Sequence, residues 1–264
     1  MPAVNPIKLR FQIEDLLSFF ESPHKFHQKL QRLFSLYANR SLRHGELTQP
    51  KLSIPTYQLP PPVPRQLHQD ILPLINKNMQ AGLDLADALW QDAYYEIKQL
   101  AIFILGNANT DHAEPILTRL ETWLDPKLDQ KLKAELLTKG TIALQSDFPT
   151  SWERLIQSLL NHNDPKMSGL GIQGLQSGAK RPGFANFPAV FRLISPILQN
   201  PHNTQLRELE NLVNTLIDIS PTETAYFLRQ TLSLSSSPET VRLVKKCLPN
   251  LPEDLRENLQ NSLS

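Results

Sequence analysis

The sequence predicts an all-α protein built from HEAT-like helix-pair repeats that form a curved α-solenoid. Three observations lead to this fold class. Apolar residues recur at helical spacing, helix starts are marked by a capping residue followed by proline, and the distances between those starts match the length of a helix pair. Leucine dominates the apolar residues and valine, which favours strands, is sparse.

The helical spacing is clear in three segments, 97–105, 152–160 and 206–217. In the first of them Ile97, Leu100, Ala101, Ile104 and Leu105 form one apolar stripe, because they follow the i, i+3, i+4, i+7, i+8 pattern of a helix face. No segment shows a convincing alternation of apolar and polar residues. The core is therefore expected to form between helices, with no sheet.

The helix starts combine a capping side chain with a proline. A Ser or Asp side chain accepts hydrogen bonds from free backbone N–H groups, and proline at the first helical position loses no bond. Two capping boxes are also predicted, Ser220 with Glu223 and Thr150 with Glu153. The pairs that mark starts are Ser22-Pro23, Asp125-Pro126, Asp164-Pro165, Ser220-Pro221 and Ser237-Pro238.

These starts also give the repeat length and the domain organisation. Asp125 and Asp164 are 39 residues apart, and Asp164 and Asn200 are 36 apart, close to the length of a HEAT repeat. Six prolines fall between Gln49 and Pro64, which predicts an extended connection. We expect an N-terminal helical pair at 1–48, a proline-rich connection at 49–64, and a continuous repeat array at 65–264.

Composition excludes several function classes. The single cysteine, Cys247, cannot form an internal disulfide and is expected to be a buried apolar residue. No segment has the roughly 20 apolar residues that span a bilayer, and the first residues do not resemble a signal peptide. No His/Cys cluster is present. We therefore expect a cytoplasmic monomer with no metal, no cofactor and no membrane contact.

The net charge is only +1, but the charges are segregated. The segment 165–207 contains no acidic residue, and Glu46 is the single acidic residue of the segment 22–69. Such segregation can present a basic face to a polyanion such as DNA. Chance segregation over solvated helices is the equally weighted alternative.

A glycine-rich segment follows Asp164-Pro165. Gly169 to Gly174 matches the G-x-G-x-x-G pattern of dinucleotide-binding proteins, but that motif needs a preceding strand and here a helix has already begun. Gly171, Gly174 and Gly178 instead fall at i, i+3 and i+7. This spacing predicts a small-residue face on which a neighbouring helix packs closely, in preference to a ligand.

Trp123 lies close to two carboxylates, Asp125 and Asp129. A tryptophan beside carboxylates can hold a cationic base and stabilise positive charge. The alternative is structural: Trp123 anchors the end of one helix and Asp125 caps the next.

A second tryptophan connects the sequence to a known family. Leu89-Trp90, Glu96 and Ala101 resemble the signature helix pair of bacterial AlkD-like alkylpurine DNA glycosylases, and Pro62-Val-Pro64-Arg65 and the segment 209–228 are similar to flanking parts of that family. The resemblance spans about residues 25–250. It implies a helical-repeat protein that binds duplex DNA, in which a modified purine is lost by hydrolysis and an Asp beside Trp stabilises the cationic sugar.

The resemblance implies Asp129, or Asp125, as the catalytic residue. The sequence departs from the family at the tandem tryptophans, expected near Pro126 and Lys127, and at an arginine expected near Leu170. These departures indicate degenerate catalytic residues. The residues expected to contact DNA are Trp123, Lys127, Lys131, Lys166, Lys180 and Arg181.

Three hypotheses follow from the sequence. The first is a protein of DNA alkylation repair type that binds duplex DNA through a basic concave surface, without sequence specificity. The second is an active alkylpurine DNA glycosylase. The third is a protein–protein interaction scaffold, a common role of helical repeats, and a protein partner remains open under all three.

Overall fold

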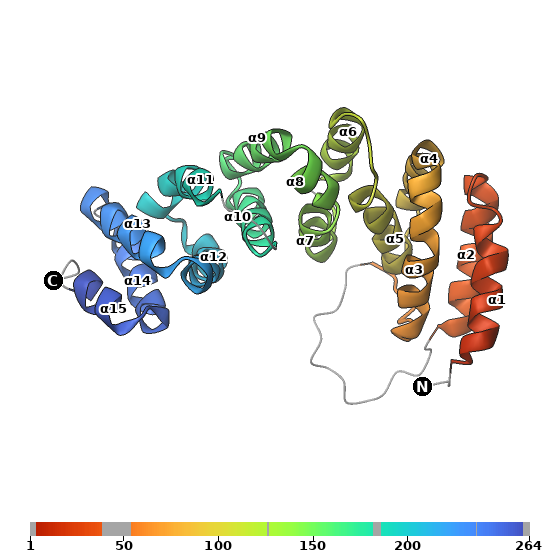
Figure 1. Ribbon diagram of the computed structural model, residues 1–264, viewed down its shortest axis with the longest axis horizontal. Coiled ribbons are helices and arrows are strands. Elements are labelled where there is room, and N and C mark those ends of the chain that lie inside the picture. Colours follow the sequence, from red (N-terminus) through yellow and green to blue (C-terminus); the bar gives the residue numbers. More distant parts are fainter. Residues whose placement is uncertain (1–3, 39–53, 126, 182–185, 236, 261–264) are drawn as a thin grey trace. The chain divides into compact units, whose positions relative to one another are not determined.

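The computed structural model describes residues 4–38, 54–125, 127–181, 186–235 and 237–260. Within these ranges every regular element is a helix, with fifteen α-helices and two short 3₁₀ helices (Figure 1). The all-α prediction is therefore confirmed. The chain divides into two compact units, Met1–Pro149 and Thr150–Ser264, and the boundary falls at the first residues of α9.

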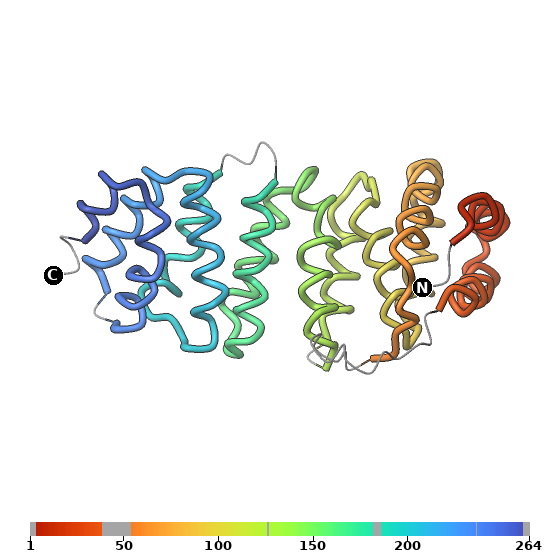
Figure 2. Tube along the Cα trace, turned by 90° about the horizontal axis from the view of Figure 1, so that it is seen from below, coloured from red at the N-terminus to blue at the C-terminus, as the bar shows by residue number. Residues whose placement is uncertain are grey.

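The first unit consists of two layers of helices. In one layer α1 packs on α3, α3 on α5 and α5 on α7, while in the other α2 packs on α4; α4 also packs against α5 across the layers. Figures 1 and 2 show these helices side by side in chain order. The bounds are α1 Pro6–Leu17, α2 Pro23–Tyr37, α3 Pro62–Lys77, α4 Met79–Trp90, α5 Tyr95–Gly106, α6 Glu114–Trp123, α7 Gln130–Thr138 and α8 Ile142–Asp147.

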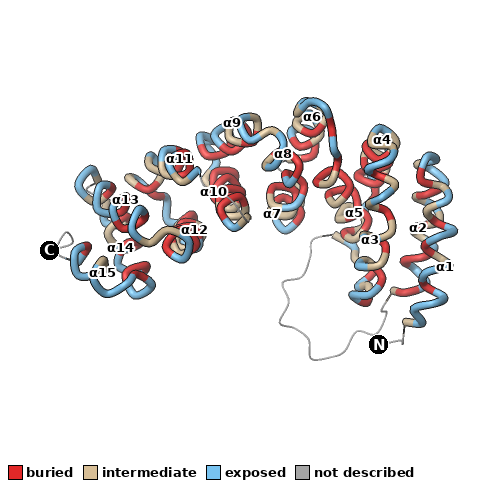
Figure 3. Tube along the Cα trace, viewed as in Figure 1, coloured by how far each residue is buried: buried red, intermediate tan, exposed pale blue. Residues whose placement is uncertain are grey.

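The second unit repeats the arrangement. One layer contains α10, α12 and α14 and the other contains α11, α13 and α15, each helix packing on the next of its layer. In both units the buried positions lie on the helix sides that face a neighbouring helix (Figure 3). The bounds are α9 Pro149–Leu160, α10 Pro165–Ala179, α11 Phe187–Gln199, η1 Asn203–Gln205, α12 Leu206–Ile219, α13 Pro221–Leu234, α14 Pro238–Cys247, η2 Leu248–Asn250 and α15 Glu253–Gln260.

Most of the predicted proline starts are correct. Helices α2, α10, α13 and α14 begin at the prolines of Ser22-Pro23, Asp164-Pro165, Ser220-Pro221 and Ser237-Pro238. In α10 the Asp164 carboxylate accepts the backbone N–H of Lys166 at 2.9 Å, as a cap should. The start predicted at Asp125-Pro126 involves Pro126, which lies outside the described residues, and α7 begins further along, at Gln130.

Both predicted capping boxes need correction. Thr150 lies inside α9, which already begins at Pro149, so it is not the residue before the helix. At α13 the Ser220 hydroxyl donates to the Glu223 carboxylate and accepts no backbone N–H. The Ser220 bond lowers the pKa of the exposed Glu223 carboxyl.

The proline-rich connection is shorter than predicted, because α3 begins at Pro62 and includes Pro64 in its first turn. Residues 49–53 lie outside the described part of the chain. The part just before α3 is held on α5 by Glu96, which accepts the backbone N–H groups of Tyr57 at 3.0 Å and Gln58 at 2.8 Å. Glu96 thereby fixes the connection at Gln58, whose φ of 52° is rare outside glycine.

The N-terminal helical pair is held by a buried carboxylate in the turn between α4 and α5. Asp92 accepts hydrogen bonds from His27 at 2.5 Å and Gln31 at 2.8 Å, both on α2, and from the N–H of Tyr94 at 2.7 Å. Burial by itself would raise the pKa of Asp92, but the Tyr94, His27 and Gln31 donors outweigh it, and the pKa lies below its ordinary value.

Two further expectations concern single features. Cys247 is fully buried at the end of α14, as predicted, and burial raises the pKa of its thiol to about 12, with Glu210 adding to the shift. In the described part of the chain, none of the helices combines the length and the apolar character needed to cross a bilayer.

Candidate functional site

Trp90 and Trp123 form a buried stack in the first unit. Trp90 is the last residue of α4 and Trp123 the last residue of α6. Their rings are nearly parallel, with centroids 4.5 Å apart and an interplanar angle of 9°. Trp90 is 7% exposed and Trp123 is 3% exposed. The Trp123 ring therefore packs against Trp90, which agrees with the structural alternative of a helix-end anchor.

Lys98 packs on Trp90. Its ammonium lies 4.4 Å from the Trp90 ring centroid and also donates to the Trp90 carbonyl oxygen. Burial lowers the pKa of Lys98, and the negative charge of Asp92 acts against that shift. A contact between a cation and the face of an indole ring contributes about 0.5–2 kcal/mol.

The two candidate catalytic carboxylates lie at the turn that leads into α7. Asp125 accepts the backbone N–H of Lys127 at 2.6 Å, and Asp129 accepts the backbone N–H of Lys131 at 2.9 Å. Asp129 is the N-cap of α7. Each carboxylate thus binds the N–H two residues further on, the bond typical of Asx turns and caps. Both positions have a local structural role in addition to any chemical one.

The two candidate lysines next to these carboxylates are exposed. Lys127 and Lys131 both reach solvent, and the Lys131 ammonium lies 4.6 Å from the Tyr95 ring centroid. Within the described residues neither lysine belongs to an ion pair, whereas Lys139, at the end of the same helix, is paired with Glu135 at 3.1 Å. The turn before α7 and the first turn of α7 therefore each present a cation that can meet an external anion.

Beside these lysines a polar network joins α5 to α7, and sequence reasoning missed it. The Tyr95 hydroxyl donates to Glu135 at 3.0 Å, and Gln99 donates to both Glu135 oxygens at 3.0 and 2.9 Å. Burial, and after it the charge of Glu135, raises the pKa of Tyr95. The Tyr95 phenol stays protonated and the network fixes α7 relative to α5. Only the i, i+4 spacing of Tyr95 and Gln99 hints at it locally.

A histidine on α3 also packs against α5. His68 stacks on Phe103 of α5, with ring centroids 4.0 Å apart and an interplanar angle of 3°. Burial, reinforced by the nearby Lys139 charge, lowers the pKa of His68 to about 4. His68 is therefore neutral near pH 7 and contributes a flat ring to this side of the first unit.

In the second unit the glycines of α10 allow α9 to pack closely. A Cβ at Gly171 would lie 2.9 Å from the Leu160 side chain, one at Gly174 would lie 2.5 Å from Ile156, and one at Gly178 would lie 2.6 Å from the Trp152 ring. The prediction of a small-residue face for a neighbouring helix is confirmed. At Gly169 an added Cβ would meet nothing within 4 Å.

The remaining candidate residues lie at the two ends of α10. Lys166 is in its first turn, Lys180 is its C-cap and Arg181 follows. The helix rises about 1.5 Å per residue, so the two ends are on the order of 20 Å apart. Lys166 and Lys180 are exposed and, among the described residues, belong to no ion pair; Arg181 is half-buried. These cations can meet separate phosphates but cannot form one cluster.

The turn between α6 and α7 is the candidate site in which the structure brings most of the predicted residues together. Trp123 anchors its first end, Asp125 and Asp129 shape its backbone, and Lys127 and Lys131 face solvent. Among the described residues, no group of three or more His, Cys, Asp or Glu side chains is placed to hold a metal ion. Chemically, the turn offers two ammonium groups to an anion, with two carboxylates beside them.

A comparison with protein families gives one match. The family model described as DNA alkylation repair enzyme matches residues 51–204. That range contains α3 to α11, and with them the tryptophan stack, the α6–α7 turn and the glycine-rich helix. Comparisons with curated proteins and with solved structures gave no match.

Proposed function

The chain belongs to the DNA alkylation repair enzyme family, and we propose that it binds duplex DNA through basic side chains, without reading the base sequence. The observation that carries the proposal is the exposure to solvent of Lys127, in the α6–α7 turn, and of Lys131, in the first turn of α7, inside the matched region. Exposed ammonium groups without an internal carboxylate partner are suited to phosphate contacts.

The chemistry of such contacts explains the expected lack of specificity. Lysines that neutralise phosphates release condensed counterions, which gives affinity that depends on salt and not on base sequence. The stack of Trp123 on Trp90 supports the turn by fixing the end of α6 two residues before Asp125. In the second unit Lys166, Lys180 and Arg181 are proposed as further phosphate contacts at the ends of α10.

Fluorescence anisotropy of a labelled duplex at low salt tests the proposal. We expect saturable binding, and we expect Lys127→Gln/Lys131→Gln to weaken it about 30-fold, since two phosphate contacts of about 1 kcal/mol each are lost. A control of equal charge change is Arg10→Gln/Lys77→Gln, which removes two exposed cations of the same unit. Absence of binding to any duplex at low salt excludes the proposal and favours a protein-interaction scaffold.

Glycosylase activity is the second candidate, because the family is one of repair enzymes and two carboxylates lie at the turn. A carboxylate near bound DNA can stabilise the positive charge that develops on the sugar of an alkylated purine. The assay is release of methylated purine from alkylated duplex DNA, and it requires no prior binding result.

The test variants can separate charge from capping. Asn caps a helix about as well as Asp, so Asp129→Asn and Asp125→Asn keep the backbone bonds and remove the negative charge. If either carboxylate is catalytic, its Asn variant releases purine about 100-fold more slowly than the wild type, or slower still. The same variant should bind DNA at least as tightly as the wild type. Unchanged release in both variants excludes these two residues as catalytic groups.

A further inference from the structure

The outer side of the N-terminal helical pair exposes apolar side chains. Ile7 is 69% exposed, Phe11 is 65% exposed and Leu36 is 59% exposed. They are three of the seven large apolar side chains that are exposed in the described part of the chain. Exposed apolar side chains that gather on one surface of a protein mark an interaction site more often than scattered ones do, so this side of the helical pair has the character of an interface.

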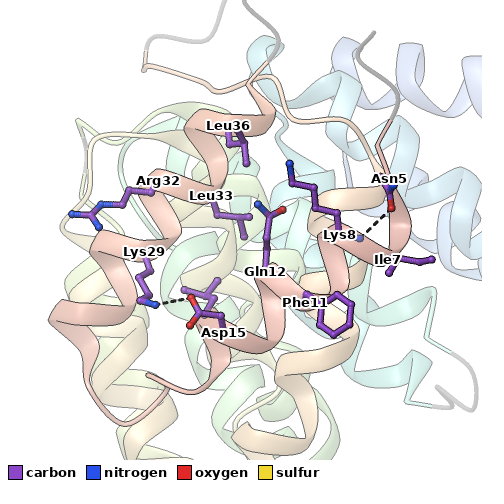
Figure 4. Close-up of a pocket in the computed structure, with 11 residues that line it drawn as sticks. Asn5, Ile7, Lys8, Phe11, Gln12, Asp15, Lys29, Arg32, Leu33 and Leu36 are labelled. Carbon is purple, nitrogen blue, oxygen red and sulfur yellow. Dashed lines mark hydrogen bonds and ion pairs between the residues drawn. The ribbon is translucent and has the colours of Figure 1, made fainter.

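A groove runs between α1 and α2 on this side (Figure 4). Its volume is about 730 Å³. Leu33 and Leu36 from α2 face Lys8 and Gln12 from α1 across it, and Ile7 and Phe11 lie along its edge on α1. Since Ile7 and Phe11 are one helical turn apart, they can pack beside apolar residues at i, i+3 and i+4 of another helix.

The charges around the groove are mostly positive. Lys8, Lys29 and Arg32 line it, and the carboxylate among its lining residues is Asp15. Asp15 is already bound by the Lys29 ammonium at 2.6 Å. Lys8 and Arg32 belong to no ion pair within the described residues. The groove thus offers an apolar floor and edge with two cations available to an acidic partner.

The positive charge of the groove also argues against the two occupants that this chain could itself supply. The segment 39–53 follows α2 directly, but it carries Arg40, Arg43 and Lys51 against Glu46 and so has the same sign as the groove. A second copy that met this groove with its own groove would place like charges together. Both arrangements are electrostatically unfavourable, and the complement is an acidic helix from another protein.

We propose that the groove between α1 and α2 is a docking site for an acidic amphipathic helix of a partner protein. The apolar face of that helix packs on Phe11, Ile7 and Leu36, and its carboxylates bind Lys8 and Arg32. This interaction lies outside the residues matched by the family model, so it is independent of the DNA-binding proposal.

The probe is a fluorescein-labelled synthetic helix of about 18 residues, with Leu at i, i+3, i+4 and i+7 and a polar face of Glu and Gln. A matched peptide carries Lys in place of Glu. With the full chain, we expect the acidic peptide to bind saturably and at least about tenfold tighter than the basic one. No saturable binding of the acidic peptide, or equal binding of the two peptides, overturns the proposal.

Two variants locate the binding. Phe11→Ser changes an exposed side chain, so it should leave the fold intact and weaken peptide binding at least about tenfold. Leu234→Ser, on α13, removes an apolar side chain that is also 65% exposed and should bind the peptide like the wild type. Equal loss in both variants, or no loss with Phe11→Ser, contradicts the proposed groove. Self-association that Phe11→Ser abolishes in sedimentation would make a second copy the occupant instead.

Duplex DNA affinity of Phe11→Ser separates the two proposals. We expect it to equal that of the wild type, because Phe11 lies on α1 and the proposed phosphate contacts of the first unit lie on α7 and the turn before it. A parallel loss of DNA affinity in Phe11→Ser contradicts the assignment of this groove to a protein partner, because it makes the α1–α2 surface part of the DNA contact.

Discussion

Two helix contacts, one in each unit, are built in opposite ways. Between α4 and α6 two large rings, Trp90 and Trp123, face each other at 4.5 Å. Between α9 and α10 a large side chain, such as that of Trp152, lies on a glycine, so that the second helix contributes almost no volume. The first contact fills the space between helices with side chains from both, and the second removes side chains from α10 so that side chains of α9 lie against its backbone.

Both contacts contain features that looked like ligand sites in the sequence. Trp123 beside two carboxylates resembles a base-binding site, and Gly169 to Gly174 resembles a dinucleotide motif. In the structure the Trp123 ring and Gly171, Gly174 and Gly178 face neighbouring helices. Packing therefore accounts for them, and the groups left for an external partner are the exposed cations nearby. The following changes test that contrast, in order of decreasing effect.

Trp123→Ala has the largest expected effect on stability. Removing a buried ring leaves a cavity beside Trp90, and such truncations destabilise proteins by about 3–5 kcal/mol. The free energy of unfolding in urea measures it, and Trp123→Phe, which keeps a ring, should lose clearly less. A loss below about 1 kcal/mol would show that the stack does not hold the end of α6.

Gly178→Ala should destabilise the second unit by about 1–3 kcal/mol, because its Cβ would lie 2.6 Å from two atoms of the Trp152 ring, which is too rigid to yield easily. The same urea experiment measures the change. If alanine were neutral here, the helices could separate without cost and the close contact would not depend on glycine.

A third contact joins α2 to the turn between α4 and α5 through polar groups, and its contribution to stability depends on pH. Because the folded-state pKa of Asp92 lies below its ordinary value of 3.8, its contribution to stability is present above that value and is lost as the pH falls through the folded-state pKa. Asp92→Asn should cost about 1–3 kcal/mol at neutral pH and remove this part of the acid dependence. Unfolding curves at several pH values below 5 measure it; an unchanged acid dependence would contradict this role.

Gly169→Ala has the smallest expected effect and the opposite sign. The added methyl meets nothing within 4 Å, so the higher helix propensity of alanine should stabilise α10 by up to about 1 kcal/mol. It is the matched control for Gly178→Ala, since both replace a glycine of the same helix. Destabilisation by both changes would mean that glycine is needed in α10 for a reason other than contact with α9.

Local signals in the sequence predicted local structure well. Proline after Ser22, Asp164, Ser220 and Ser237 marked true helix starts, and the spacing of the α10 glycines predicted close packing. The capping box predicted at Thr150 was wrong because Pro149, the residue before it, is already helical.

Contacts between residues far apart in the chain were not predictable from one sequence. Trp90 meets Trp123, His27 meets Asp92 and Gln99 meets Glu135 only after the helices have packed. Spacing within one helix carries no information on its partner. For the same reason the sequence identified the basic residues of the candidate site but not the network of Tyr95, Gln99 and Glu135 beside them.

The salt dependence of duplex binding tests the proposed function most directly. A plot of log affinity against log salt concentration should be steeply negative for the wild type and shallower by about 2 for Lys127→Gln/Lys131→Gln, roughly one unit per lost phosphate contact. The Arg10→Gln/Lys77→Gln variant should keep the wild-type slope. A slope near zero for the wild type would contradict phosphate binding by these lysines. So would an equal slope for the wild type and Lys127→Gln/Lys131→Gln.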